Sequence, residues 1–380
     1  MDVLLCADTL RSPPLRHEIP AAIMDEIVYA EHDGRAYVAG SLLERTDVLR
    51  ARPDVEFVDV GELGVDELLA RGIGWDEMYA HLTLRLCQRI GLTRAAVPFA
   101  FPAGVFEVLR AGGVDLDIDG RLFDVRRRVK SAAELAGVRR AARAAEAAAT
   151  AVAAGLAAAE RRDDGLLWAD GEPLDVERPR SAAEDAARAH GSTLDGSIIA
   201  VGEQAADGHE SGFGPVRAGA GVVCDLWPQD RASGCFADFT RTFVAGGDPS
   251  EELVVWHGLC RDALARVLDA VAPGVTGREL WEVACDVFEA AGHATQRTKA
   301  EGESLDHGFY HSLGHGVGLQ VHEEPILGRS GVRPLVEGDV IAIEPGTYRP
   351  GFGGVRIEET VLVTADGHEV LTHFDHELRI

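Results

Sequence analysis

Four carboxylates and one imidazole follow one another in the second half of the chain, each in a segment with the pattern of a strand or a tight turn. These residues are Asp225, Asp238, His315, Glu344 and Glu358. A carboxylate-rich set with one nitrogen ligand suits divalent ions of intermediate hardness, such as manganese, cobalt, iron or zinc. Two such ions about 3.5–4 Å apart can lower the pKa of a shared water and stabilise negative charge on an attacked carbonyl. The residue types therefore predict a two-metal centre for hydrolysis.

Asp225 and Asp238 are expected on neighbouring strands. Asp225 interrupts the apolar run Val-Val-Cys-Asp-Leu, and Asp238 lies in Phe-Ala-Asp-Phe-Thr-Arg-Thr-Phe, with Gly234 in the turn between them. A hairpin brings both carboxylates together. A charge inside a buried strand needs a partner, and a metal ion supplies one.

Glu344 and Glu358 complete the acidic set. Glu344 ends an apolar strand expected over 340–344, and Glu358 lies in a strand expected over 355–363. Alternation places Glu358 on the same face as Arg356 and turns Glu359 the other way, so Glu358 is the preferred ligand. A single acid of this kind is more often a salt-bridge or surface residue, so the prediction depends on the joint occurrence.

Segment 311–322 contains three histidines among glycines. The histidines are His311, His315 and His322, and the glycines are Gly314, Gly316 and Gly318. An HxxxH pair on a helix is typical of zinc proteases, but the glycines disfavour a helix and no glutamate follows His311. We expect a glycine-rich strand or turn, in which the backbone can approach a ligand closely.

The remaining pattern predicts an α/β (α+β) protein with two domains. Residues 1–128 mix short apolar runs with helical segments such as 76–90, which is typical of an α/β domain. Ser131-Ala-Ala-Glu134 is a capping box that opens an alanine-rich helix to about residue 160, so the domains are placed at 1–128 and 129–380.

Further elements are expected in the second domain. A loop or short hairpin over 163–179 precedes a helix over 181–190. Two more helices are predicted to start at Asp248-Pro-Ser-Glu251, with the proline just inside the cap, and at Thr276-Gly-Arg-Glu279. Strands dominate the rest and hold four of the five candidate ligands.

Composition narrows the possible partners. The chain has 380 residues, 46% of them hydrophobic, with 37 basic against 63 acidic residues and a net charge of −26. Such a charge repels nucleic acid and anionic membranes, so neither is expected as a partner. The start of the chain lacks the pattern of a signal peptide and no run is apolar enough to span a membrane, which predicts a cytoplasmic protein. The six cysteines lack CxxC spacing and are expected to be reduced thiols.

At these residues the chain resembles the pita-bread metallopeptidases, the family of methionyl aminopeptidase, Xaa-Pro aminopeptidase and prolidase. The similar segments are Asp-Phe-Thr-Arg-Thr-Phe, Leu-Gly-His-Gly-Val-Gly-Leu, Ile-Glu-Pro-Gly and Val-Arg-Ile-Glu-Glu-Thr. The junction from Arg127 to Glu134 resembles that of the proline-specific branch. The resemblance implies a creatinase/prolidase-like N-terminal domain, a pita-bread C-terminal domain with a mainly antiparallel curved sheet, and a homodimer formed through the N-terminal domain.

The resemblance also implies an activity and residue roles. Short peptides with proline after the scissile bond would be hydrolysed by a hydroxide that bridges two divalent ions, manganese first, with cobalt, zinc or iron as alternatives. Both a dipeptidase and an aminopeptidase fit. The family's five ligands fall on the five residues named above, and Glu344 would also shuttle the proton. His209 matches the first active-site histidine, His311 the one beside the substrate, His322 the one that contacts the scissile carbonyl, and Arg356 the arginine that supports the metal site.

The segment after Asp225 departs from the family pattern. The family usually has a glycine two residues on, whereas this chain has Trp227 and a longer segment to Arg231. Trp227 is either part of the core or a wall that selects substrates, and Asp230 and Arg231 are expected in a solvated loop. Two other functions stay open: a pita-bread metalloenzyme with a non-peptide substrate, of lyase or amidinohydrolase type, and a non-catalytic binding module.

Overall fold

The computed structural model describes residues 1–380, apart from the side chain of Asp76. By its internal contacts the chain divides into two compact units. The first unit comprises Met1–Arg127 and Ala232–Gly234, and the second comprises Arg128–Arg231 and Cys235–Ile380.

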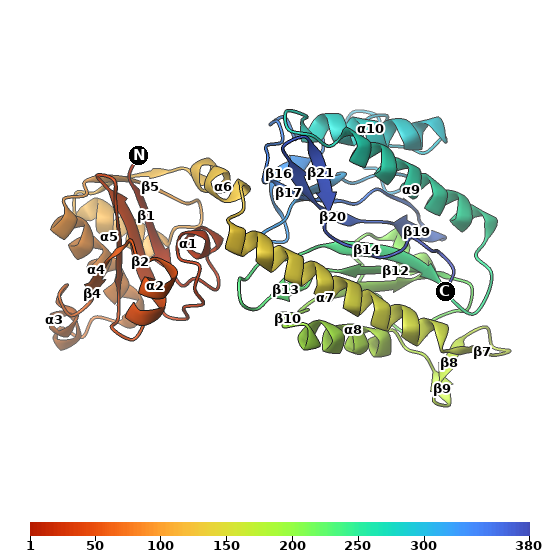
Figure 1. The fold of residues 1–380 in the computed structure, drawn as a ribbon, viewed down its shortest axis with the longest axis horizontal. Helices are drawn as coiled ribbons and strands as arrows, with labels where there is room; N and C mark the ends of the chain where they lie inside the picture. The colour runs from red at the N-terminus through yellow and green to blue at the C-terminus, as the bar shows by residue number, and fades with distance from the viewer. The chain divides into compact units, whose positions relative to one another are not determined.

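The first unit contains one mixed six-stranded sheet (Figure 1). Its strands are β1 (Val3–Ala7), β2 (Ile27–His32), β3 (Arg35–Gly40), β4 (Glu56–Asp59), β5 (Arg94–Val97) and β6 (Asp115–Ile118). The strand order is β4-β3-β2-β1-β5-β6, with antiparallel pairs β1/β2 and β2/β3 and parallel pairs β3/β4, β1/β5 and β5/β6.

Side chains that alternate along β1 fill two cores in this unit. Leu4 packs with residues of the long helices such as Leu86, whereas Val3 and Leu5 pack with Leu15 on the other face. The helices are α1 (Pro13–Glu18), α2 (Arg45–Ala51), α3 (Val65–Ala70), α4 (Trp75–Ile90), α5 (Ala103–Ala111) and α6 (Gly120–Arg128). A sheet with apolar side chains on both faces needs cover on both, so the α/β prediction for this part is confirmed.

The second unit is built from antiparallel sheets. Strands β11 (Ser197–Val201), β12 (Gly221–Leu226) and β14 (Phe239–Val244) form one of them in the order β11-β12-β14. A second has the order β16-β15-β17-β20-β21, from β15 (Gly314–Gly316), β16 (Glu323–Leu327), β17 (Val340–Ile343), β20 (Glu359–Thr364) and β21 (Gly367–Val370). Three smaller sheets comprise β18 (Gly346–Arg349) with β19 (Gly353–Arg356), β10 (Ser192–Thr193) with β13 (Gln229–Asp230), and β7 (Glu160–Arg161), β8 (Leu167–Ala169) and β9 (Glu172–Pro173).

Two pairs of helices enclose these strands. Figure 1 shows β12, β14, β19 and β20 between α9 and α10 on one side and α7 and α8 on the other. The helices are α7 (Ala132–Ala157), α8 (Glu177–Ala189), α9 (Glu251–Ala270) and α10 (Gly277–Ala290), and a 3-10 helix, η1, covers Gly202–Ala206. Buried alanines such as Ala145 and Ala149 let α7 approach both α8 and the β11-β12-β14 sheet closely, which explains the alanine-rich sequence.

Helix starts follow the predicted capping boxes at two of three positions. Ser131 caps α7 and Thr276 caps α10, each with the glutamate three residues on bonding back. The predicted start of α9 was wrong, because Ser250 is its N-cap and accepts from the Leu253 backbone N–H, so the proline precedes the cap.

The strand expected over 355–363 is interrupted. It divides into β19 and β20, with two residues between them. Ile357 N donates to the Pro345 carbonyl (3.3 Å) and Glu358 N to the Thr240 carbonyl (3.0 Å), so the backbone leaves one sheet and enters the other at Glu358. Segment 163–179 contains the short antiparallel hairpin of β8 and β9, as predicted, and β7, which precedes the segment, pairs with β8 as a third strand.

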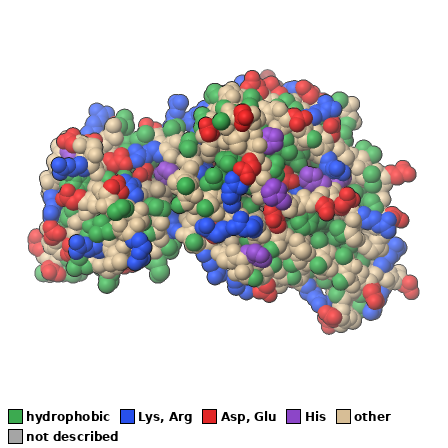
Figure 2. All heavy atoms as spheres, in the orientation of Figure 1, with side chains coloured by type: hydrophobic (Ala, Val, Ile, Leu, Met, Phe, Trp, Pro, Cys, Tyr) green, Lys and Arg blue, Asp and Glu red, His purple; other side chains and the backbone are tan. Residues whose placement is uncertain are grey.

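Among the described residues, no helix combines the length and apolarity that a bilayer crossing needs. All six cysteines are buried, and none forms a disulfide in the part of the chain that the structure describes. Figure 2 shows acidic and basic side chains interspersed over the visible face of both units.

Candidate metal centre

Asp225 and Asp238 come together because their strands pair. Asp225 in β12 lies opposite Thr240 in β14, and Asp238 directly precedes β14. Two hydrogen bonds to the Thr360 hydroxyl hold the backbone of Asp238. The Asp238 N–H donates to Thr360 Oγ1 (3.0 Å), and the Asp238 carbonyl accepts from the same hydroxyl (2.7 Å). The predicted hairpin is therefore present, with Asp238 at the entry to the strand.

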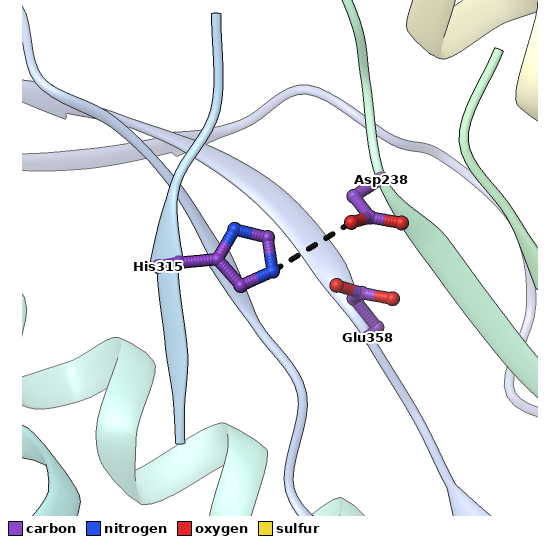
Figure 3. A group of neighbouring side chains, drawn as sticks. All are labelled: Asp238, His315 and Glu358. Atoms are coloured by element: carbon purple, nitrogen blue, oxygen red, sulfur yellow. Dashed lines mark ion pairs between the residues drawn. The ribbon is translucent and has the colours of Figure 1, made fainter. Parts of the chain in front are cut away.

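The other three residues reach the same place from the neighbouring sheet. His315 lies in β15, which pairs with β17, and Glu344 directly follows β17. His315 Nε2 lies 3.7 Å from both Asp238 Oδ2 and Glu344 Oε1. Glu358 Oε2 accepts from Thr240 Oγ1 (2.7 Å). Figure 3 shows His315, Asp238 and Glu358 pointing toward one another, and one potential ligand atom from each lies within 4.8 Å of the others.

The tautomer of His315 follows from its contacts. Its Nδ1 lies 3.1 Å from the Gly316 carbonyl, which can only accept a hydrogen bond, so Nδ1 carries the proton. Nε2 then faces the carboxylates with a free lone pair, which is the form that binds a metal ion.

Five side chains, Asp225, Asp238, His315, Glu344 and Glu358, form what is called here the carboxylate centre. Burial raises the pKa of Asp238 and of Glu358, and the neighbouring carboxylates raise both further. Burial also raises the pKa of Glu344 to about 8, against the opposing effect of Arg356. Crowded, buried carboxylates resist ionisation unless a cation is near.

The donor set of this centre fits divalent cations. Asp225 Oδ1 is a buried oxygen without a hydrogen-bond partner among the residues that the structure describes. Four carboxylates face a single guanidinium, so negative charge is in excess. Oxygen donors with one imidazole suit manganese, cobalt, iron and zinc.

Arg356 is the guanidinium of the site and is 4% exposed. Its Nη2 donates to Asp225 Oδ2 (2.5 Å) and its Nη1 to the Tyr348 hydroxyl (2.9 Å). Its Nε lies 3.9 Å from Glu344 Oε2. Arg356 therefore occupies one oxygen of Asp225 and leaves the other free for a ligand.

The remaining predicted histidines differ in environment. His311 Nδ1 bonds to the Ser312 carbonyl (2.6 Å) and its Nε2 lies 3.0 Å from the Tyr348 hydroxyl, while burial and then Arg356 lower its pKa to about 3. The half-buried His322 ring has its centroid 4.3 Å from that of His315, and its pKa is lowered chiefly by burial. His209 is exposed, and its backbone N–H donates to Asp207 Oδ1 (3.0 Å).

One pocket of about 920 Å³ in the second unit gathers every residue predicted for the site. These are the carboxylate centre with His209, His311, His322 and Arg356. Trp227 lines the same pocket. Of the two interpretations of this residue, this position favours a wall of the substrate pocket over a residue of the core alone.

Two tyrosines at the site were not predicted: Tyr310, which lines the pocket, and Tyr348, which bonds to His311 and Arg356 of its lining. Tyr348 connects His311 to Arg356, and Tyr310 accepts from Gly208 N (2.9 Å) and stacks on Tyr348 with ring centroids 4.9 Å apart. Their sequence context does not indicate a role in the site, because an aromatic residue in or beside a strand is typical of a hydrophobic core.

The prediction of a solvated loop at Asp230 was wrong. Asp230 is 2% exposed, and its two carboxylate oxygens accept from Arg140 of α7 at 2.9 and 2.8 Å. The segment after Asp225 is thus tied to the helix rather than free in solvent.

Comparison with known proteins assigns the family. The model of metallopeptidase family M24 matches residues 136–365, so the chain belongs to this family, which confirms the resemblance to the pita-bread enzymes. Some curated relatives are called Xaa-Pro dipeptidase and others only uncharacterized peptidase. The Xaa-Pro dipeptidase of Lactobacillus helveticus is 38% identical over 188 residues, covering 48% of this chain and 46% of the relative. That of Pyrococcus furiosus is 40% identical over 142 residues, covering 37% of each chain. The chain thus spans less than half the length of these relatives.

Solved structures extend the likeness to both units. The Xaa-Pro dipeptidase of Bacillus anthracis has a TM-score of 0.80 at 22% identity, covering 100% of this chain and 95% of that one. The prolidase of Pyrococcus furiosus has a TM-score of 0.75 at 23% identity, covering 98% and 96%. These likenesses show the fold, and the predicted two-part mixed architecture is confirmed.

Proposed function

We propose that this protein hydrolyses the peptide bond before proline in short peptides, as an Xaa-Pro dipeptidase or aminopeptidase that uses two divalent ions. One observation carries the proposal: a single pocket brings together the carboxylate centre, three further histidines and Arg356. Membership of family M24 and the relatives called Xaa-Pro dipeptidase support the same reaction.

The five side chains of the carboxylate centre would hold the ions. Bound there, divalent ions supply a water of lowered pKa and stabilise negative charge on the scissile carbonyl. Arg356 fixes Asp225 through Oδ2 and leaves Oδ1 free. The Gly316 carbonyl holds His315 in the tautomer that presents Nε2. Manganese is the first ion to test, with cobalt, zinc and iron as alternatives, because the donor set accepts all four.

His322 and Glu344 would carry the proton chemistry. The lowered pKa of His322 keeps its ring neutral at pH 7, so one ring nitrogen can donate an N–H to the carbonyl oxygen as its charge develops. Glu344 would accept the proton of the attacking water at a carboxylate oxygen and deliver it to the proline nitrogen as the bond breaks.

His311 and His209 would position the peptide. Both nitrogens of His311 are already engaged, Nδ1 by a carbonyl and Nε2 by the Tyr348 hydroxyl, so His311 is a poor proton donor and a rigid wall. His209, exposed at the pocket, remains able to contact a peptide. A homodimer and a cytoplasmic location stay predictions.

The test is hydrolysis by protein that has been stripped of metal and resupplied with manganese, cobalt or zinc. An Xaa-Pro dipeptide, an Xaa-Pro-Xaa tripeptide and a Met-Ala peptide form the panel. We expect metal-dependent cleavage before proline, with the dipeptide alone marking a dipeptidase and the tripeptide an aminopeptidase. Asp238→Asn should abolish it, and Asp366→Asn at an exposed turn serves as the matched control. Full activity in chelator, or no cleavage with any metal despite metal binding, contradicts the proposal.

A further inference from the structure

The entrance to the carboxylate centre has an apolar side built by a strand pair. Strands β11 and β12 pair with Ile198 opposite Asp225, and the next two positions of this register set Gly196 opposite Trp227. Opposite residues of antiparallel strands, and residues two apart, face the same side of a sheet. All four residues line the pocket, so Trp227 lies on the face of Asp225, about 7 Å further along the strand direction.

The indole of Trp227 is held against Gly196. A Cβ atom on Gly196 would lie 2.8 Å from Trp227 Cζ2 and 3.3 Å from Nε1, so a larger residue at 196 would displace the ring. The ring also packs beside the buried cluster that includes Ala205 and Val223. Trp227 is half-buried, and it lines the pocket, so its position is fixed by packing while part of it meets the ligand space.

Charge and apolar surface indicate which part of a peptide lies here. Asp207 lines the pocket next to Gly208, whose carbonyl lies 3.4 Å from the Arg356 guanidinium that also binds Asp225. This acidic end suits the α-amino group of a peptide. Because Arg356 contacts both Gly208 and Asp225, the side chain on the same carbon is assigned to the side of Asp225, where Ile198 and Trp227 line the pocket.

We propose that Trp227 is the specificity-determining residue for the side chain that precedes proline, and that it selects aliphatic side chains over large aromatic and acidic ones. The inference rests on the proposed Xaa-Pro peptidase function. The indole closes the apolar space beyond Asp225 and so excludes bulky rings. Aspartate and glutamate are disfavoured because they would meet apolar walls beside the carboxylates of Asp207 and Asp225.

The test compares kcat/KM for Leu-Pro, naphthylalanine-Pro and Glu-Pro with metal-loaded wild type, Trp227→Ala and Trp227→Phe. We expect Trp227→Ala to raise the ratio of naphthylalanine-Pro to Leu-Pro by about 10-fold or more, with Trp227→Phe between it and wild type. Trp168→Ala, at a tryptophan outside the pocket, is the matched control and should leave the ratio unchanged. An unchanged ratio in both folded Trp227 variants overturns the inference while the peptidase function stands.

A second readout separates the two proposals. In metal-free protein, which cannot hydrolyse the peptide, Leu-Pro should change the tryptophan fluorescence of wild type and not of Trp227→Phe. If wild type cleaves no Xaa-Pro peptide, the proposed function fails, and the fluorescence then decides the inference. A Leu-Pro response that depends on Trp227 supports an aliphatic subsite, and equal responses in the two proteins, or none in either, overturn it.

Discussion

Two consecutive glutamates, Glu358 and Glu359, belong to two different buried clusters of charged side chains, which differ in whether the protein itself balances the charge. Glu358 joins the carboxylate centre, where four acids face one guanidinium. Glu359, on the other side of the backbone, bonds to Arg241, to Thr372 and to His376 Nε2 (2.7 Å). We call Arg241, Glu359, Thr372 and His376 the arginine cluster.

In the arginine cluster, the buried guanidinium of Arg241 faces the buried carboxylate of Glu359, and every nitrogen of the guanidinium is hydrogen-bonded. Arg241 is 1% exposed, and its nitrogens donate to Glu359 Oε1 (2.5 Å) and to the carbonyls of Glu358 (2.8 Å), Phe374 (2.7 Å) and Asp375 (3.0 Å). One cation there meets one anion and several carbonyls. The carboxylate centre instead has surplus negative charge and the unpartnered Asp225 Oδ1. A buried charge that the protein balances itself therefore supports the fold, whereas a buried charge left unbalanced indicates a ligand.

The largest expected effects come from changing the two glutamates separately. Glu358→Gln should lower hydrolysis by more than about 100-fold, because even removal of groups behind metal ligands costs 10–100-fold. Its metal-free form should be as stable as wild type, since glutamine removes one crowded charge. Glu359→Gln should retain metal but lose about 3 kcal/mol of unfolding free energy, because Arg241 then has no counter-ion.

Bound metal, hydrolysis and denaturant unfolding of both variants, with and without chelator, check this pair. Wild type should become more stable when metal is added, by mass action, and Glu358→Gln should not. Two results would contradict the separate roles of the two glutamates: Glu359→Gln loses its metal at unchanged stability, or Glu358→Gln destabilises the metal-free protein as much as Glu359→Gln does.

The sequence predicted the members of the carboxylate centre, with Arg356 beside them, but not Thr240 and Thr360, which fix Glu358 and Asp238. An acid that interrupts an apolar strand, such as Asp225, or ends one, such as Glu344, is visible because burial there demands a partner. Alternation also separated Glu358 from Glu359, although the two lie where the chain passes from β19 to β20 rather than within one strand. The assignment of the five residues as metal ligands remains a proposal.

The arginine cluster could not be predicted in the same way. Arg241 lies in Thr-Arg-Thr, a sequence equally suited to an exposed strand face, and three of its carbonyl partners, on Glu358, Phe374 and Asp375, lie more than a hundred residues away. The same holds for the bidentate pair between Asp230 and Arg140, which depends on how α7 crosses the sheet. Long-range pairing of this kind depends on tertiary packing, which local periodicity does not encode.

A smaller effect is expected from Tyr348, which connects Arg356 to His311. Tyr348→Phe removes the hydroxyl that accepts from Arg356 Nη1 and bonds to His311 Nε2. We expect kcat/KM to fall about 10- to 100-fold at unchanged metal content, because Arg356 and His311 lose their common support.

Tyr310→Phe is the matched control for this change. The Tyr310 hydroxyl bonds to backbone groups of Gly208 and Ala206 and not to Arg356, so its removal should affect kcat/KM less. Steady-state kinetics and metal analysis of both variants decide it. Loss of bound metal in Tyr348→Phe would show that the tyrosine supports the ligands rather than the orientation of His311.

The smallest expected effect is on acid stability beside the arginine cluster. His257 in α9 is 6% exposed, and burial first, then Arg261, His376 and Arg241, lower its pKa to about 4. Between this value and the ordinary pKa of histidine, near 6.5, the unfolded chain binds more protons than the folded one, so the unfolding free energy falls as the pH is lowered. His257→Gln removes this contribution.

In chelator, the unfolding free energy that wild type loses between pH 7 and 5.5 should exceed the loss in His257→Gln by about 1 kcal/mol. The exposed His307→Gln should behave as wild type. If His257→Gln and wild type lose stability in parallel, the acid sensitivity lies elsewhere, and the arginine cluster tolerates a further positive charge that its balanced design should exclude.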